Sequence, residues 1–333
     1  MKVPTKSVTM DDVAREAGVS RALVSIAYRG VAGVSEETKK RVFAAADKLG
    51  YRPNRIAATL ASKVSNTLGV FLQDLRNDIF ADIFDGIREV ANVNGKHLVL
   101  AIGDIDGGMD ARALDTLLQS RVDVVIAAGL VLPDDAVRQF ARTMPMVSVM
   151  RLVEGVDGVY SDNLAGARAA TRHLISLGHR RIAFLANPQT DGYLDRQRGF
   201  LEQMETARLE PQIIPSHYSR SLAAQDIGEA LDSTDCPTAI FAHNDQAALG
   251  VLDAMASRGL HAPADISVVG YDNSGVSKAP GTELTTVNLH GRKLGRDAAT
   301  MALQRLADPS APANHKVRLP SLVVRTTTGP VAR

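Results

Sequence analysis

The chain has 333 residues, of which 45% are hydrophobic and 23% charged, and it contains a single cysteine, Cys236. This length suits two or three domains with large buried cores. One cysteine excludes an intramolecular disulfide and a cysteine-rich zinc site, so Cys236 is expected to be a small buried hydrophobic residue. No run of about 18 apolar residues predicts a membrane span, and the start lacks the apolar stretch of a secretion signal, so a cytoplasmic location is expected.

Charge is distributed unevenly along the chain. Residues 1–63 have a net charge of +6, whereas the remaining residues have a net charge of −5. A basic segment joined to a mildly acidic body is typical of a module that binds a polyanion and is attached to a module with another role.

The first helices are predicted near the start. Thr9 is placed to cap a helix that ends at Gly18, and Ser20 is placed to cap a second helix from Arg21 to about Arg29. The residues expected to pack inward are Val13, Ala14, Ala17, Val19, Leu23, Val24 and Ala27. The spacing of Ala14, Gly18 and Val24 is that of a helix-turn-helix, whose second helix enters the major groove of DNA. A generic helical hairpin is the alternative, but the caps and the downstream segment favour DNA binding.

A third helix and a short hinge helix are expected next. Ser35 is placed to cap a helix from Glu36 to Leu49 that ends at Gly50, with Val42, Phe43, Ala46 and Leu49 facing the core of the head. The segment from Tyr51 to Ala61 contains Pro53 and is too short for a stable isolated helix. It is therefore predicted to become helical only on DNA and beside its symmetry mate, with a plain interdomain linker as the alternative.

Short apolar runs alternate with amphipathic helices from Thr67 onward. Candidate strands are residues 68–72, 97–101, 124–128, 146–149, 181–186, 239–242, 266–270 and 322–325. Candidate helices are residues 79–94, 110–120, 134–142, 163–177, 195–207, 222–231, 245–258 and 292–307. This alternation predicts parallel sheets with helices on both faces. The segment 155–162 is expected to divide the series into two α/β lobes, with a ligand cleft at the carboxyl ends of the strands.

No pattern predicts an enzyme. The chain has no phosphate loop, no H-E-x-x-H and no nucleophile elbow, and its eight histidines are scattered without metal-ligand spacing. Residues 103–110 superficially resemble a calcium loop, but the required glycine is misplaced and Asp115 stands where glutamate is needed. This run is expected to cap the next helix instead. No cofactor and no metal are expected.

Several motifs together resemble the LacI/GalR family of bacterial transcriptional repressors: DVAREAGVS, LGYRPNRIAATLA, LGHRRIAFL, HNDQAALG, ISVVGYDN and LTTV. The resemblance extends from about Val8 to Thr327. It implies an all-α helix-turn-helix headpiece with a hinge helix, followed by a two-lobed α/β body similar to periplasmic sugar-binding proteins. The expected divisions are a headpiece at 1–52, a hinge and linker at 53–66, a first lobe at 67–158 and 290–319, and a second lobe at 159–289 and 320–333.

The resemblance also implies which residues contact DNA. Arg21, Ala22 and Ile26 would read base edges, and Ile26 departs from the polar residue that relatives often carry there. The residues that would contact phosphates are Thr9, Ser20, Ser25 and Arg29. In the hinge helix, Asn54 and Arg55 would contact the DNA backbone, Ala57 the minor groove, and Leu60 would wedge between base steps, unless Leu60 is an ordinary linker residue. The expected partner is a near-palindromic operator bound by a homodimer.

For the cleft, the resemblance implies a set of effector-binding residues: Asp74, Phe80, Arg151, Arg196, Tyr218, Asn244 and Asp272. Arginine, asparagine and aspartate suit paired hydrogen bonds to sugar hydroxyls, and aromatic rings suit C–H surfaces. Met150 and Leu289 replace polar residues found in relatives, so a polyol, a sugar phosphate and a non-sugar all stay open. Asp272 could instead cap a helix, and Arg196 could be a surface ion-pair partner.

The expected mechanism is allosteric. A small ligand, expected to be a sugar or polyol, would close or rotate the lobes, move the hinge helices and change operator affinity, with coupling of roughly 1–3 kcal/mol. Induction and corepression are both open. Two rival classes are an enzyme and an unregulated solute-binding protein, which would lack the basic head. A third alternative is a purine-responsive corepressor-type regulator, and Thr190 and Gly192 argue against it. Because the chain ends soon after its last strand, a dimer without a C-terminal tetramerisation helix is expected.

Overall fold

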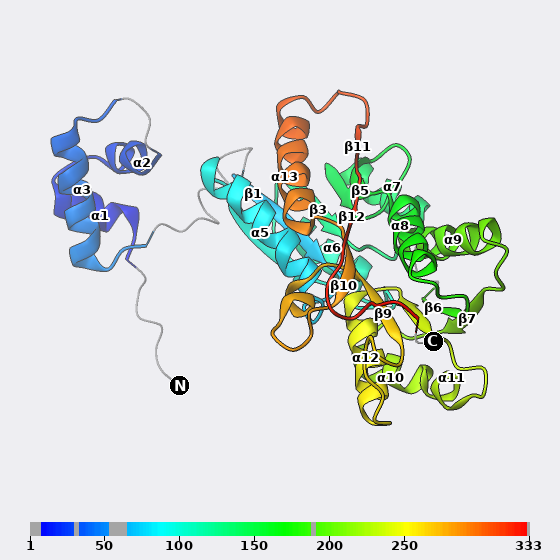
Figure 1. Cartoon of the computed structure of the whole chain (residues 1–333). Helices are drawn as coiled ribbons and strands as arrows, with labels where there is room; N and C mark the ends of the chain where they lie inside the picture. Colours follow the sequence, from blue (N-terminus) through cyan, green and yellow to red (C-terminus); the bar gives the residue numbers. More distant parts are fainter. Residues whose placement is uncertain (1–7, 30–32, 53–64, 188–190, 332–333) are drawn as a thin grey trace. The chain divides into compact units, whose positions relative to one another are not determined.

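The computed structural model describes residues 8–29, 33–52, 65–187 and 191–331. The chain forms two compact units, residues 1–65 and 66–333, which we call the head and the body (Figure 1). The residues predicted for the hinge helix, Asn54, Arg55, Ala57 and Leu60, lie outside the described residues.

The described residues of the head form the three helices that were predicted there: α1 (Met10–Ala17), α2 (Arg21–Arg29) and α3 (Glu36–Leu49). Thr9 and Asp12 make a reciprocal capping box at the start of α1, because each backbone N–H donates to the other side chain, at 2.9 and 3.3 Å. Gly18 ends α1 with φ +63°, a conformation that glycine adopts without a Cβ clash. The caps therefore place the turn between α1 and α2 where the sequence predicted it.

The core of the head differs from the prediction at Phe43, whose side chain is 40% exposed. It lies on the edge of the buried stripe of α3 and packs edge-to-face against Tyr28, with ring centroids 5.2 Å apart. Ala45 takes the buried position instead, because Val42, Ala45 and Ala46 share one helical face.

The first lobe of the body is built on a parallel sheet with the strand order β11-β5-β4-β3-β1-β2. Its strands are β1 (Thr67–Leu72), β2 (His97–Ile102), β3 (Val124–Ala128), β4 (Met146–Val149), β5 (Asp157–Ser161) and β11 (His315–Arg318). Its helices are α5 (Asp78–Val93), α6 (Asp110–Gln119), α7 (Asp134–Thr143) and α13 (Gly291–Ala307). Helices α5 and α13 pack on one face of this sheet and α6 and α7 on the other.

The second lobe has the strand order β12-β10-β9-β8-β6-β7. Its strands are β6 (Ile182–Ala186), β7 (Gln212–Pro215), β8 (Ala239–Ala242), β9 (Ser267–Asp272), β10 (Thr285–Asn288) and β12 (Ser321–Val323). Its helices are α8 (Asn163–Ser176), α9 (Asp191–Thr206), α10 (Arg220–Asp226), α11 (Gly228–Asp232), α12 (Asp245–Ala256) and the 3-10 turn η1 (Gly275–Lys278). Strand β12 pairs antiparallel with β10, so the predicted parallel arrangement does not extend to this edge of the sheet.

Strand β5 corrects a second expectation. Residues 155–162 do not simply separate the lobes, because Asp157–Ser161 forms a buried strand between β4 and β11. Strands β7, β10 and β11 were also absent from the prediction, and each is only four residues long. The predicted helix 222–231 is divided into α10 and α11.

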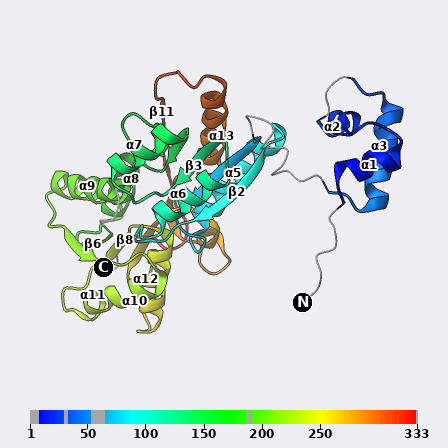
Figure 2. The same cartoon turned by 180° about the vertical axis from the view of Figure 1, so that it is seen from behind.

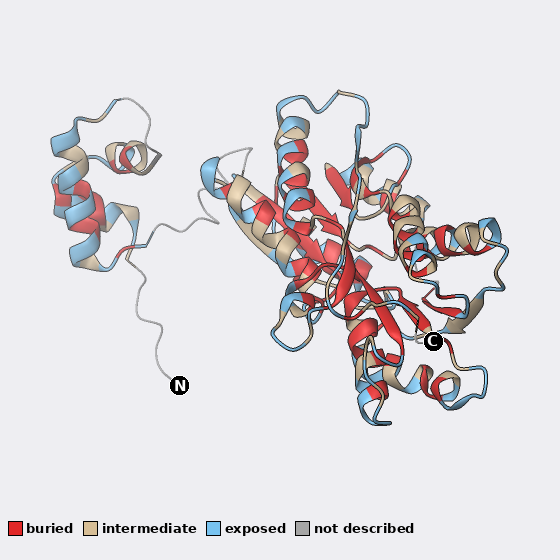
Figure 3. Cartoon of the chain, viewed as in Figure 1, coloured by how far each residue is buried: buried red, intermediate tan, exposed pale blue. Residues whose placement is uncertain are grey.

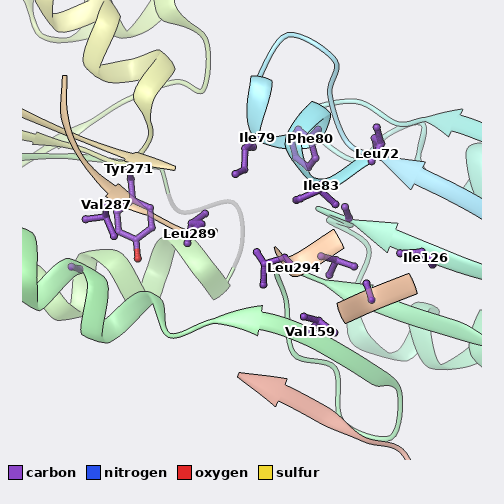
Figure 4. Packing of buried hydrophobic residues seen from close by; sticks show 14 of the residues in the cluster. Leu72, Ile79, Phe80, Ile83, Ile126, Val159, Tyr271, Val287, Leu289 and Leu294 are labelled. Atoms are coloured by element: carbon purple, nitrogen blue, oxygen red, sulfur yellow. The ribbon is translucent and has the colours of Figure 1, made fainter. Parts of the chain in front are cut away.

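One hydrophobic core runs through both lobes. Alternate residues of the strands point to it, so Leu68, Val70 and Leu72 of β1 face α5 and α13, whereas Phe71 faces the opposite cluster. Figure 3 shows the buried strands inside a more exposed layer of helices. Figure 4 shows Ile79, Phe80 and Leu294 on the first-lobe side and Tyr271 and Val287 on the second-lobe side.

Helices α5 and α13 approach closely at two glycines, and the views from both sides place them side by side (Figures 1 and 2). A Cβ atom on Gly86 would lie 2.1 Å from the carbonyl oxygen of Arg292, and one on Gly295 would lie 2.0 Å from that of Ile83. No side chain fits at either position, so the helix spacing depends on glycine.

Candidate functional site

The start of α2 lies on the surface of the head. Arg21 and Ala22 are exposed, Ser25 and Ile26 are half-buried, and the side chain of Arg29 lies outside the described set. The Nε atom of Arg21 lies 3.8 Å from Oδ1 of Asp11 in a solvent-exposed ion pair, which contributes little stability and leaves the guanidinium available to a ligand.

The other two positions predicted for phosphate contacts are helix caps. The Oγ atom of Ser20 accepts from the N–H of Leu23 at 3.3 Å, and the hydroxyl of Thr9 donates to Asp12 at 2.7 Å. Arg41 of α3 donates to the carbonyl of Ala17 at 2.6 Å and so holds the end of α1. The head therefore presents a rigidly capped α2 with one exposed arginine at its start.

Arg196 of α9 is the centre of the polar cluster in the body, with only 3% of its surface exposed. Its Nε donates to Oδ1 of Asn163 at 3.0 Å, and its Nη1 donates to the main-chain carbonyl of His243. The guanidinium carbon lies 4.7 and 3.9 Å from the ring centroids of Tyr193 and Tyr271. The alternative that Arg196 is a surface ion-pair partner was therefore wrong.

Asp272 ends β9 and faces this cluster. Its Oδ1 lies 3.8 Å from Nη2 of Arg196, and its Oδ2 accepts from Asn77 of the first lobe at 3.2 Å. Its φ of +117° is costly for a residue with a Cβ, and such strain is concentrated at functional sites. Asp272 makes no cap to η1, whose Val276 N–H donates to Asp78 instead, so the helix-cap alternative was also wrong.

Two further predicted residues join the cluster. Asn244 caps α12 through its Oδ1, which accepts from Ala247 N–H at 2.7 Å, while its buried Nδ2 has no hydrogen-bond partner. The hydroxyl of Tyr218 accepts from Nδ2 of Asn77 at 2.9 Å. Arg196, Tyr218, Asn244 and Asp272 thus converge in the second lobe.

Burial controls the protonation states here. Burial raises the pKa of Asp272, and the opposite charge of Arg196 counteracts part of that rise. Burial and the nearby Asp272 raise the pKa of Asp245, whose carboxylate accepts from Ser274 and Thr286. Burial lowers the pKa of His243 to about 3, so its ring is neutral near pH 7.

The first-lobe residues predicted for the cleft have other contacts. Asp74 is buried and accepts from the N–H of Arg76 at 2.9 Å. Phe80 belongs to the hydrophobic core. Arg151 donates to the carbonyls of Leu130 and Leu132 and to Asp134, so it anchors the loop that follows β3.

A small cavity remains between the lobes. Its volume is about 30 Å³, enough for about one water molecule, whereas ligand pockets typically exceed about 300 Å³. Of the predicted effector-binding residues, Arg151 and Arg196 line it; the other lining residues are Gln73, Gly129, Leu130, Met150, Gly192 and Tyr193.

Sequence reasoning missed three residues of this cluster: Asn77, Asn163 and Tyr193. Asn77 precedes α5 as its N-cap, and Asn163 begins α8, so both carry a signal typical of helix starts. Nothing local indicates that Asn77 also reaches across to the second lobe, because that contact joins residues 195 positions apart.

In the described parts of the chain, no helix is long and apolar enough to cross a membrane. The same parts hold no group of three or more His, Cys, Asp or Glu side chains arranged to bind a metal ion. Asp104 and Asp106 instead accept from N–H groups of Met109 and Gly108, within the loop before α6.

Comparisons with known proteins match both units. Residues 9–54 match the family described as bacterial regulatory proteins, lacI family, and residues 171–328 match the periplasmic binding protein-like domain. The HTH-type transcriptional regulator DegA of Bacillus subtilis (strain 168) is 31% identical over 97% of this chain and 98% of its own length. A crystal structure of the lac repressor dimer bound to operator and the anti-inducer ONPF is 30% identical, with a TM-score of 0.86 over 97% of this chain and all of that one. A complex of the transcriptional regulator CelR with cellobiose is 28% identical, with a TM-score of 0.71 over 96% of this chain and 99% of that one.

Proposed function

The chain belongs to the LacI family of bacterial regulatory proteins and is a DNA-binding transcriptional regulator; from this premise we propose that a small, uncharged, polyhydroxylated ligand held between its lobes sets its affinity for an operator. The relatives with which it aligns over nearly its whole length are transcription regulators, which supports a role in binding and regulation without catalysis. The lac repressor dimer bound to operator supports action as a homodimer on a near-palindromic site.

The head supplies the DNA contacts in this proposal. Arg21, Ala22 and Ile26 meet base edges in the major groove, and Arg21 is the one of these three with hydrogen bonds to offer. Thr9, Ser20, Ser25 and Arg29 contact phosphates and set the register of α2. In the hinge helix, Asn54 and Arg55 contact the DNA backbone, Ala57 the minor groove, and Leu60 separates base steps.

The pairing of the body's polar groups supports an uncharged ligand. Both cationic side chains at the cavity already have partners in the protein: Arg151 donates to the carbonyl of Leu132 and to Asp134, and Arg196 donates to the carbonyl of His243 and forms a 3.8 Å ion pair with Asp272. A phosphate group would therefore be repelled by the carboxylates of Asp74 and Asp272, and neither arginine could pair with it without giving up its present partners. A sugar phosphate is for this reason the weaker candidate.

The unpaired groups support hydroxyls. The Nδ2 of Asn244 makes no hydrogen bond, and neither does the Oδ1 of Asp272, which lies 3.8 Å from Arg196, so a hydroxyl group could accept from the first or donate to the second. Tyr193 and Tyr218 add aromatic surface, with ring centroids 6.5 Å apart. The neighbour that carries cellobiose supports the same chemical class. This unpaired donor and acceptor beside Arg196 is the observation that carries the proposal.

A thermal-shift screen of neutral sugars, polyols, sugar phosphates and nucleobases tests it, because a specific ligand stabilises the folded state by mass action. A neutral sugar or polyol should raise the melting temperature of the wild type and not of Asp272→Asn. The effect of the stabilising sugar or polyol on binding of the protein to a DNA sequence selected from a random pool should then be measured. A shift produced only by nucleobases or sugar phosphates would refute the proposed ligand class.

A further inference from the structure

The side chain of Asn77 connects the two lobes directly. It is 2% exposed and precedes α5 in the first lobe. Its Nδ2 donates to the hydroxyl of Tyr218 at 2.9 Å and to Oδ2 of Asp272 at 3.2 Å, both in the second lobe. One amide group thus uses both of its N–H donors on two residues of the polar cluster.

The orientation of this amide is set by the helix it caps. The Oδ1 of Asn77 accepts from the N–H of Ile79 at 3.2 Å, as an N-cap does. With its oxygen held on α5, the amide nitrogen points away from the helix and toward the second lobe. The cap therefore explains why a short side chain makes contacts so far away in sequence.

Neighbours of Asn77 reinforce the contact. The carbonyl of Arg76 accepts from Nε2 of Gln246 at 3.1 Å, and Oδ2 of Asp78 accepts from the N–H of Val276 at 3.2 Å. Gly275 permits this approach, because a Cβ atom there would lie 2.8 Å from Oδ2 of Asp78. We call residues 76–78 and their four hydrogen-bonded partners in the second lobe the lobe bridge; the partners are Tyr218, Gln246, Asp272 and Val276.

We propose that Asn77 is a positioning residue of the effector site, whose amide orients the Tyr218 hydroxyl and the Asp272 carboxylate and holds the two lobes together when no effector is bound. The inference rests on the proposed function for the meaning of the site, but the bridge itself can be tested without any ligand. A ligand hydroxyl that donated to Oδ2 of Asp272 would compete with Asn77 for that oxygen.

The test is hydrogen exchange of the full chain without ligand, comparing the wild type with Asn77→Ser. Serine keeps an N-cap oxygen for α5 but is too short to reach the second lobe. Exchange in residues 274–279 should rise roughly tenfold, because the Val276 amide bond to Asp78 opens with the lobes. Asn94→Ser, at the opposite end of α5, is the matched control, since its amide donates only within that region, to the carbonyl of Val90.

A second variant separates positioning from general destabilisation. Tyr218→Phe removes the hydroxyl that accepts from Asn77 and keeps the ring. It should also increase exchange in residues 274–279. If the two side chains act together, the fold-increase in the double variant should be smaller than the product of the two single fold-increases. Exchange that stays within twofold of the wild type in either folded single variant, or fully independent effects in the double variant, would overturn the proposal.

The two proposals fail in different ways. Unchanged exchange together with a sugar that stabilises the wild type would remove the role of Asn77 and leave the proposed function. Increased exchange, together with no thermal shift from any sugar or polyol, would support the lobe bridge and refute the proposed ligand class.

Discussion

Replacing Arg196 with methionine should destabilise the body by about 3–5 kcal/mol, because the change removes one partner of a buried ion pair and leaves the other charged. The variant loses the hydrogen bonds to Asn163 and to the carbonyl of His243, and Asp272 keeps a carboxylate that is 2% exposed. Methionine fills the space between Tyr193 and Tyr271, so the cost comes mainly from lost polar contacts.

Urea unfolding followed by circular dichroism measures this cost. Arg198→Met is the control, because Arg198 lies on the same helix, is 61% exposed and pairs with Asp195 at 3.0 Å. That surface pair should contribute no more than about 1 kcal/mol. If Arg196→Met costs no more than Arg198→Met, the buried pair has no special importance and the assignment of Arg196 to the centre of the site fails.

The same variant should regain stability as the pH falls from 7 toward 5. Burial raises the pKa of Asp272 above the unfolded value, and losing Arg196 raises it further, since that charge lowers it. A carboxyl whose folded-state pKa is raised binds its proton more readily in the folded state, so folding is favoured as the pH drops through that pKa. The double variant Arg196→Met/Asp272→Asn should cost less than the single one at pH 7, and an equal or larger cost would contradict the explanation.

Three further variants test other parts of the structure. Gly295→Ala should lower the free energy of unfolding, measured in urea, by about 2 kcal/mol or more, because its Cβ would lie 2.0 Å from the carbonyl oxygen of Ile83. This cost outweighs the higher helix propensity of alanine. Gly228→Ala is the control and should be close to neutral, because its Cβ would meet only the flexible end of Arg258 at 3.2 Å. Ser35→Ala should lower the stability of the head by about 1 kcal/mol, seen in its thermal melting, and Ser35→Thr should not, since only alanine loses the cap to Thr38 at 3.2 Å. Arg21→Ala should weaken binding to a selected operator by about 1–3 kcal/mol and much less to random DNA; equal losses on both, with a smaller salt dependence, would reassign Arg21 to a phosphate contact.

Local chemistry made much of the fold predictable. The caps at Thr9, Ser20 and Ser35 and the glycines at 18 and 50 act within one helical turn, so their pattern located three helices closely. Buried strands such as β3, Val124–Ala128, were also predicted with the bounds that the structure gives, because all residues of β3 are apolar. The short strands β10 and β11 were not, since Thr285–Asn288 and His315–Arg318 are rich in polar residues and become strands only through their neighbours.

The site was less predictable for the same reason. Arg196, Tyr218, Asn244 and Asp272 were named from their motifs and do converge, whereas Asp74 and Arg151 bond to residues of their own lobe and Phe80 packs into the core. Asn77 illustrates the limit. Its role as an N-cap follows from its neighbours along the chain, whereas its bonds to Tyr218 and Asp272 span 141 and 195 residues.

The order of the strands has a consequence for how this protein is made. Strand β5 pairs with β11, and Asp157 pairs with Arg305, which follows 148 residues later. During translation, the first sheet therefore stays incomplete until β11 is synthesised, which happens after every strand of the second sheet except β12. During that interval the edge of β5 lacks its strand partner, so nascent chains are most exposed to mispairing before residue 318 emerges.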